Sequence, residues 1–81
     1  MIMVDVFVPA LDQTFDIRTD ENNVPGRLVE ELVQLLGRRT GEEPEENREY
    51  TLYQYQTGAR LKEALTLYAQ GIRDGSRLLL V

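Results

Sequence analysis

The segment VPGRLVEELVQLL, residues 24–36, decides the fold of this chain. Its leucines recur at spacings of three and four residues, so Leu28 and Leu32 share one face of a predicted helix. Pro25 is tolerated in a first helical turn, and Gly37 is predicted to end the helix in the left-handed conformation. A lone helix of this length is marginal in water, so other segments must cover its apolar face.

Four segments with alternating apolar residues are predicted to supply that cover as strands. Residues 1–8 and 14–18 are joined by a short connection and are predicted to form an N-terminal hairpin. Residues 50–55 and 77–81 are the third and the last main strand, with a short extended piece at Leu61 between them. The residues predicted to form the core are Val4, Val6, Phe15, Ile17, Val24, Leu28, Leu32, Leu52, Leu65, Leu67, Ile72, Leu78 and Leu80.

The remaining segments are predicted to be turns and loops. Residues 66–71 indicate one tight helical turn that ends at Gly71, and residues 73–76 hold an Asp-Gly pair typical of a sharp reversal. Residues 40–49 contain glycine, proline and several glutamates, so we expect an exposed acidic loop; the ligand pattern of a calcium loop is absent. This order of elements predicts an α+β domain of two layers, a sheet packed on one main helix.

The chain has 81 residues and a formal net charge of −5, with neither cysteine nor histidine. A single domain over residues 1–81 accounts for this length. The composition excludes disulfides, thiolate chemistry and acid–base chemistry by histidine. Negative charge repels phosphate backbones, so nucleic acid is not an expected partner. No apolar run approaches the roughly 18 residues of a membrane span, and no signal-peptide pattern is present. We therefore expect a cytoplasmic protein without direct membrane insertion.

No set of residues in the sequence indicates catalysis. A nucleophilic serine or threonine needs a base, and the one candidate is Lys62, which falls in an expected exposed turn. The carboxylates of Glu30 and Glu31 lie on the polar face of the predicted helix, where solvation explains them. We therefore expect no enzyme activity, no catalytic residues, no cofactor and no metal site.

The second half of the chain carries a more specific pattern, which consists of Leu61, Thr66-Leu67, Gly71-Ile72, Asp74-Gly75 and Leu78-x-Leu80-Val81. This pattern resembles the end of ubiquitin-like β-grasp domains. With the Val-Pro start and Glu-Leu-Val pattern of the helix, the whole chain is similar to the YukD/EsaB family, small bacterial ubiquitin-like proteins of type VII secretion systems. The resemblance implies a mixed sheet of four to five strands with the first and last strands as central neighbours. It also implies an accessory or regulatory protein of such an ESX-like system that acts by binding other proteins.

Two other readings remain open. The chain also resembles the cytosolic N-terminal domain of EccD membrane subunits, so it is alternatively such a domain cut from a larger protein. Ubiquitin-like modifiers and sulfur carriers end in a diglycine, whereas this sequence as given stops at Leu80-Val81, so we expect neither conjugation nor sulfur transfer. A modifier or carrier without its tail is the third reading. Whether Val81 is the native C-terminus is left open; the reading frame and the neighbouring genes distinguish these three readings.

The outer face of the predicted sheet is the candidate binding site. If Leu78 and Leu80 point inward, the period of two places Leu79 and Val81 on the opposite face. With the strand order that the resemblance implies, apolar residues of three strands meet there, and such patches seldom stay uncovered without a use. The expected occupants are components of the secretion system, which would bring the protein to the inner face of the membrane, or weakly a second copy. The predicted partner face consists of Met3, Phe7, Tyr53, Tyr55, Leu79 and Val81.

Overall fold

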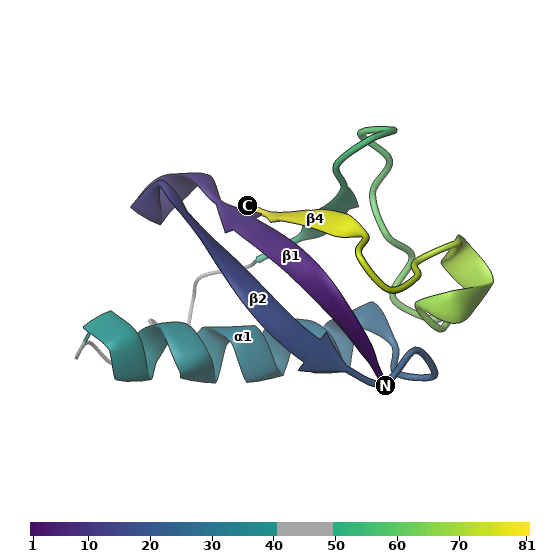
Figure 1. The fold of residues 1–81 in the computed structure, drawn as a ribbon, viewed down its shortest axis with the longest axis horizontal. Coiled ribbons are helices and arrows are strands. Elements are labelled where there is room, and N and C mark those ends of the chain that lie inside the picture. The colour runs from purple at the N-terminus through teal and green to yellow at the C-terminus, as the bar shows by residue number, and fades with distance from the viewer. Residues whose placement is uncertain (41–49) are drawn as a thin grey trace.

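A computed structural model describes residues 1–40 and 50–81, with only the backbone described at residues 38–40. The acidic loop expected at residues 40–49 therefore lies almost wholly outside the described residues. The elements follow the predicted order of hairpin, helix, strand, helical turn and strand (Figure 1). Their bounds are β1 Ile2–Val8, the 3-10 turn η1 Pro9–Leu11, β2 Gln13–Thr19, α1 Pro25–Thr40, β3 Leu52–Gln54, the 3-10 turn η2 Tyr68–Gln70 and β4 Arg77–Leu80.

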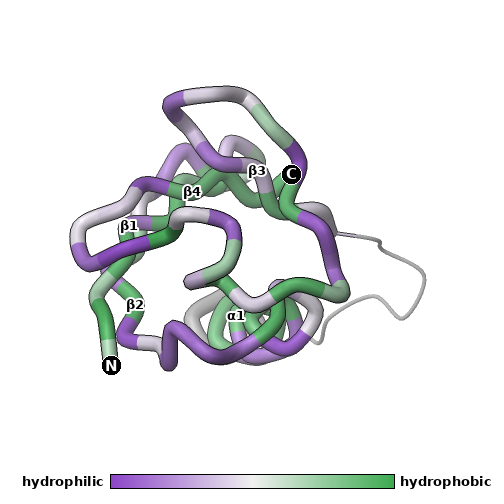
Figure 2. Tube along the Cα trace, turned by 90° about the vertical axis from the view of Figure 1, so that its right-hand side faces the viewer, coloured by the Kyte–Doolittle hydropathy of each residue, from purple (hydrophilic) through white to green (hydrophobic). Residues whose placement is uncertain are grey.

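The four strands form one mixed sheet in the order β2-β1-β4-β3. β1 pairs with β2 and β3 pairs with β4 in antiparallel fashion, whereas the central neighbours β1 and β4 are parallel. α1 lies against one face of this sheet and, seen end-on, forms a second layer beneath it (Figure 2). The predicted α+β class and the mixed sheet on one main helix are therefore confirmed.

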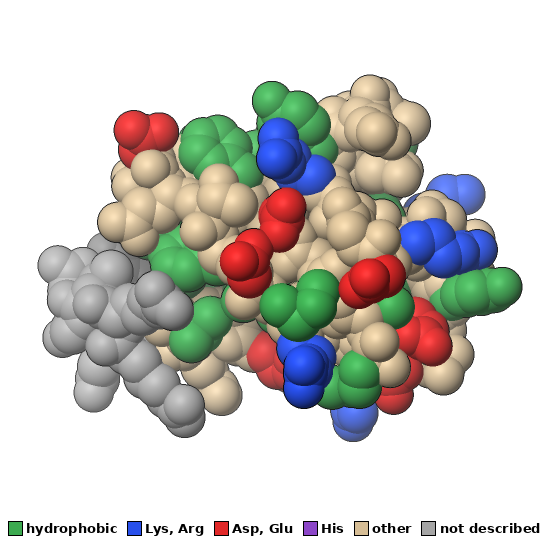
Figure 3. All heavy atoms as spheres, viewed as in Figure 1, with side chains coloured by type: hydrophobic (Ala, Val, Ile, Leu, Met, Phe, Trp, Pro, Cys, Tyr) green, Lys and Arg blue, Asp and Glu red, His purple; other side chains and the backbone are tan. Residues whose placement is uncertain are grey.

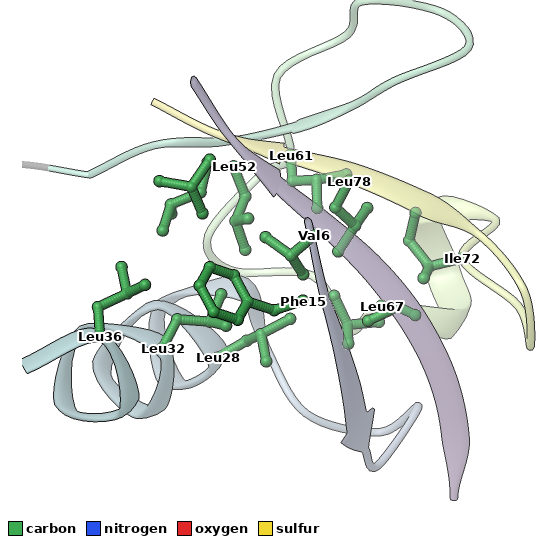
Figure 4. Close-up of a cluster of buried hydrophobic side chains, with 13 residues drawn as sticks. Val6, Phe15, Leu28, Leu32, Leu36, Leu52, Leu61, Leu67, Ile72 and Leu78 are labelled. Carbon is green, nitrogen blue, oxygen red and sulfur yellow. The ribbon is translucent and has the colours of Figure 1, made fainter. Parts of the chain in front are cut away.

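The core lies between α1 and the sheet, and it contains most of the residues predicted from alternation (Figure 4). Leu28, Leu67, Ile72 and Leu78 have no exposed surface. Val24 and Ile17 are only half-buried, and Ile17 packs against the core from its margin. The core also contains Val8, which continues the alternation of Val4 and Val6, and Leu36, which continues the apolar face of the helix. Leu61, predicted only as a short extended piece, is buried as well.

The prediction that Leu65 belongs to the core is wrong, because 42% of its surface is exposed. The segment before η2 is organised by a polar side chain instead. Gln70 Oε1 accepts a hydrogen bond from the backbone N of Lys62, and Gln70 Nε2 donates to the carbonyl oxygens of Lys62, at 2.8 Å, and Leu65, at 3.0 Å. These bonds satisfy backbone groups that a buried loop would leave unpaired, so the loop runs over the surface with the Leu65 side chain outward.

The prediction that Gly37 ends the helix is also wrong, because α1 continues to Thr40. A glycine ends a helix when it adopts the left-handed conformation, and the glycines of the described chain with positive φ are Gly58, Gly71 and Gly75. Inside a helix a glycine costs only about 0.5–1 kcal/mol relative to alanine. The turn that holds the buried Leu36 therefore runs on through Gly37.

The turns that position β4 are those predicted. Gly71 ends η2 with φ of 84°, and the N of Ile72 donates to the carbonyl of Leu67 at 3.0 Å, which directs Ile72 into the core. Gly75 has φ of 85° in the Asp-Gly turn before β4. β3 is shorter than the predicted strand 50–55, because a turn begins at Gln54, whose carbonyl accepts from the N of Gly58 at 2.9 Å.

Candidate functional site

The face of the sheet away from α1 carries an apolar row that crosses three strands. Phe7 of β1 lies opposite Leu79 of β4, and Leu79 lies opposite Tyr53 of β3. Their chain neighbours Val6, Leu78 and Leu80 are buried toward α1, so the period of two places the apolar row on the outer face. All three side chains are half-buried. The structure thus brings together Phe7, Leu79 and Tyr53, which form the apolar row.

The other members of the predicted partner face lie around this row rather than in it. Val81 extends it along the chain, is 57% exposed, and exchanges backbone hydrogen bonds with Thr51. Tyr55 lies two residues after Tyr53, just past the end of β3, where its N donates to the carbonyl of Arg77 at 3.0 Å. Met3 is separated from Phe7 by Asp5 of the same strand. The predicted partner face is therefore an apolar row with Val81 beside it, while Tyr55 lies at the end of a neighbouring row of charged residues and Met3 lies beyond that row.

That charged row contains two aspartates side by side, Asp5 of β1 and Asp16 of β2, which are register partners. The protonated Asp16 carboxyl group donates a hydrogen bond to the Asp5 carboxylate, and this bond, followed by the negative charge of Asp5, raises the pKa of Asp16 above its ordinary value. Arg77 is the register partner of Asp5 on β4, yet its guanidinium lies over the Tyr55 ring, 5.5 Å from the ring centre. In the described part of the chain, no ion pair involves either carboxylate of this acid pair.

The acid pair predicts how stability depends on pH. Because the pKa of Asp16 is raised by folding, its ionisation works against the folded state, and stability falls as pH rises through that raised pKa. Asp16→Asn should therefore raise the melting temperature at pH 7 and change it little at a pH where the carboxyl group is protonated. Glu63→Gln removes the same charge from another exposed position and serves as the control. Equal melting temperatures for the two variants at pH 7 would contradict the assignment.

Asp5 of the acid pair lines an open hollow at the Tyr55 end of the outer face. Its volume is about 470 Å³, and its lining is Asp5, Gln54, Tyr55, Gln56, Asp74, Gly75, Ser76 and Arg77. This mixed lining of carboxylates, amides and one guanidinium suits hydrogen bonds with polar groups of a partner. Within residues 1–40 and 50–81, no group of three acidic side chains is close enough together to hold a metal ion.

The sequence also matches the family model of protein YukD of the WXG100 protein secretion system (Wss) over residues 2–80. The chain belongs to the YukD family. The resemblance drawn from the helix start and the C-terminal pattern is therefore confirmed, and the chain is a ubiquitin-like protein of type VII secretion. No curated protein matches its sequence.

Solved structures show that this YukD-family chain has the ubiquitin-like β-grasp fold. The EccD5 ubiquitin-like domain from Mycobacterium xenopi has a TM-score of 0.76 at 22% identity, over 99% of this chain and 91% of that one. A chain of the MycP5-free ESX-5 inner membrane complex has a TM-score of 0.76 at 23% identity, over 99% of this chain but 20% of that one. A ubiquitin-like domain from Arabidopsis thaliana has a TM-score of 0.72 at 20% identity, over 99% and 74% of the two chains.

The acid pair is the feature of this YukD-family protein that sequence reasoning missed. Alternation alone places Asp5 and Asp16 on the outer faces of neighbouring strands. Their alignment depends on the hairpin connection, where η1 is followed by Asp12 in the left-handed conformation at φ of 50°. The alternation therefore indicated the face on which each aspartate lies, but it did not indicate that the two residues lie opposite each other.

No helix within the described residues is long and apolar enough to cross a membrane.

Proposed function

We propose that this YukD-family protein is an accessory or regulatory component of type VII secretion that acts by binding another component through the outer face of its sheet. The observation that carries the proposal is the apolar row of Phe7, Leu79 and Tyr53, which no other part of the described chain covers completely. Under this proposal the protein performs no reaction itself and works by binding rather than by covalent conjugation. It acts in the cytoplasm, at the inner face of the membrane when its partner is there.

The chemistry of the face supports a partner with apolar side chains. Removing apolar surface from water contributes roughly 25 cal/mol per Å², before the entropic cost of association. Three half-buried side chains and the exposed Val81 offer such surface in one stretch of the sheet. Aromatic residues at the centre of an interface are typically those that dominate its energy, which points to Tyr53 and Phe7 as the main anchors. The surrounding aspartates and arginines then form the polar rim that specific interfaces usually have.

In a second candidate function, this chain is a cytosolic domain of a larger membrane subunit, and it binds its partner through the same face. The likeness to the EccD5 ubiquitin-like domain and to a chain of the ESX-5 inner membrane complex supports this candidate, since both align with 99% of this chain. The two candidates differ in the length of the encoded protein rather than in the binding surface. Sequencing the full reading frame distinguishes them, because only the second predicts apolar membrane spans elsewhere in the same protein.

Site-specific photo-crosslinking in the source cells tests the proposed function. A photoreactive amino acid at Tyr53 should produce an adduct that mass spectrometry identifies as a component of the secretion system. The control is the same amino acid at Tyr68, which is 56% exposed on η2 and lies outside the predicted partner face. An absence of adducts at Tyr53, or equal adducts at both positions, would overturn the proposed use of this face.

A further inference from the structure

β2 is an unprotected edge of the sheet. At the opposite edge, β3 is covered by its own chain, because the N of Gln54 donates to the carbonyl of Ala59 and the N of Leu61 donates to the carbonyl of Leu52, each at 2.9 Å. β2 extends over seven residues with an unbroken register to β1, and no described residue pairs with its outer side. Long unpaired edges are usually covered or blunted, because they readily pair with another strand.

The backbone groups exposed at this edge follow from the hydrogen bonds of β1. The N of Asp5 donates to Ser76 and the carbonyl of Met3 accepts from Gly75, so the odd-numbered residues of β1 direct their backbone groups toward β4. The even-numbered residues of β1 therefore bond with β2. Through the observed register, this leaves the backbone N–H and C=O groups of Thr14, Asp16 and Arg18 directed away from the sheet.

An apolar groove runs beside the same edge, between β2 and α1. Its volume is about 300 Å³, and its lining is Ile17, Glu31, Leu32, Gln34 and Leu35. Ile17 is only half-buried, so part of its apolar surface stays uncovered next to the unpaired backbone groups. Figure 3 has the same view as Figure 1, in which β2 lies toward the viewer. On this side of the molecule, hydrophobic side chains lie among acidic and basic ones. The edge thus offers both a hydrogen-bonding strand and apolar surface.

We propose that a second copy of this chain covers the edge, by antiparallel pairing of β2 with β2 about a twofold axis at Ile17. In this register Asp16 of each copy lies opposite Arg18 of the other, in pairs that exchange two backbone hydrogen bonds. Opposite charges in directly facing positions stabilise a strand pair. The two Ile17 side chains meet at the axis and continue the apolar groove from one copy to the other. The two four-stranded sheets become one.

The two neighbouring symmetric registers toward the start of β2 are disfavoured by charge or by burial. An axis at Asp16 places two carboxylates opposite each other, each beside an Asp5 carboxylate, and like charges in such positions are destabilising. An axis at Phe15 sets two side chains opposite each other that are already buried in their own cores, since only 5% of Phe15 is exposed. The axis at Ile17 adds the Arg18 charge of the second copy next to the acid pair, whose carboxylates have no cationic partner among the described residues.

This charge pattern identifies the occupant as a second copy rather than a foreign strand. Asp16 and Arg18 are complementary to themselves under antiparallel pairing, and a foreign segment gains nothing from that symmetry. One strand pair with its groove is a small interface, well below the roughly 1,600 Å² of a standard one, so the dimer is weak and depends on concentration. The outer face takes no part in this contact, so the dimer is compatible with a partner bound there.

Charge reversal tests the dimer by sedimentation equilibrium. The wild-type chain should shift from monomer to dimer as its concentration rises, whereas Asp16→Arg and Arg18→Asp should each weaken association at least about tenfold, because like charges then face each other. Both positions are exposed, so thermal melts should show folded variants. An equimolar mixture of the two variants should form a heterodimer, since every facing pair is again complementary.

A wild-type chain that stays monomeric at every concentration overturns the proposal and leaves the edge to a strand of another protein. So do single variants that dimerise as the wild type does, or a mixture that does not assemble. The outer-face variant Tyr53→Ser/Leu79→Ser should dimerise normally, because β2 is intact. A loss of dimer in that variant assigns the contact to the outer face and overturns the β2 contact.

A cysteine substitution tests the register. The chain has no cysteine, so an introduced thiol is unique. Residues facing each other in a pair without hydrogen bonds have Cα atoms about 4.5 Å apart, within the range of a disulfide. Ile17→Cys should therefore form a disulfide-linked dimer with oxidised glutathione, whereas Asp16→Cys, whose facing residue is Arg18, should not. Faster cross-linking of Asp16→Cys contradicts the axis at Ile17.

Discussion

Leu32→Ala should lower the free energy of unfolding by about 2–5 kcal/mol, the cost of deleting a buried leucine side chain and leaving a cavity. Leu32 is 2% exposed and lies on the face of α1 that meets the sheet (Figure 4). A domain of this size buries only about 60% of the surface of its unfolded chain, so it has few other contacts to compensate. Denaturation by urea, followed by circular dichroism, measures the loss.

Leu65→Ala is the matched control, because it makes the same chemical change at a side chain that is 42% exposed. Its effect should stay within about 0.5 kcal/mol, as for most surface substitutions. A loss below about 1 kcal/mol at Leu32, or equal losses at the two positions, would show that α1 does not bury its leucine face as described.

Alternation predicted the two faces of the sheet correctly. In β4 the sequence Leu78-Leu79-Leu80 contains no polar residue, yet Leu78 and Leu80 are buried and Leu79 is half-buried. The prediction succeeded because only one register directs Ile72 and β4 together into the core, and a slip by one residue would reverse every side chain of a strand. The order of the strands came from the family resemblance, since local patterns carry no information on which strands are neighbours.

Local patterns failed where distant polar contacts or helix continuation decide the structure. Leu65 was placed in the core by its hydrophobicity alone, but Gln70 holds that loop on the surface. Gly37 was assigned as a helix end by residue type, although the backbone around it continues the helix to Thr40. Both errors rest on local preferences of modest energy, which do not decide a structure by themselves.

The candidate site was predicted as a set of residues but not as an arrangement. Its members were found from alternation, whereas the register makes Phe7 and Tyr53 neighbours of Leu79 and leaves Met3 beyond Asp5. Alternation shows on which face of the sheet a residue lies, but not which residues of the neighbouring strands lie opposite it. Those neighbours depend on how each connection aligns the strands. The acid pair of Asp5 and Asp16 was missed for the same reason.

Tyr53→Ser/Leu79→Ser should abolish the binding of the secretion partner while the chain stays folded. The double variant removes two of the three side chains of the apolar row, including an aromatic anchor. Truncating such central residues commonly costs 2 kcal/mol or more each, so affinity should fall by about a hundredfold or more. Both side chains are half-buried, so a stability loss of about 1 kcal/mol each is expected, which a folded domain tolerates.

The control variant removes the same two residue types from a different surface. Leu65→Ser/Tyr68→Ser changes a leucine that is 42% exposed and a tyrosine that is 56% exposed, both in or next to η2. If the outer face is the binding site, this variant should behave as the wild type in binding and in thermal melts. If it also loses binding, the partner covers more than the outer face.

The central claim, that the outer face joins this protein to the secretion system, is tested most directly in cells that lack the native gene. The amount of WXG100 protein in the culture medium is measured after complementation with each variant at equal intracellular level. We expect wild type and Leu65→Ser/Tyr68→Ser to restore secretion, and Tyr53→Ser/Leu79→Ser not to restore it. Full secretion with a folded Tyr53→Ser/Leu79→Ser protein would show that the outer face does not join this protein to the secretion system.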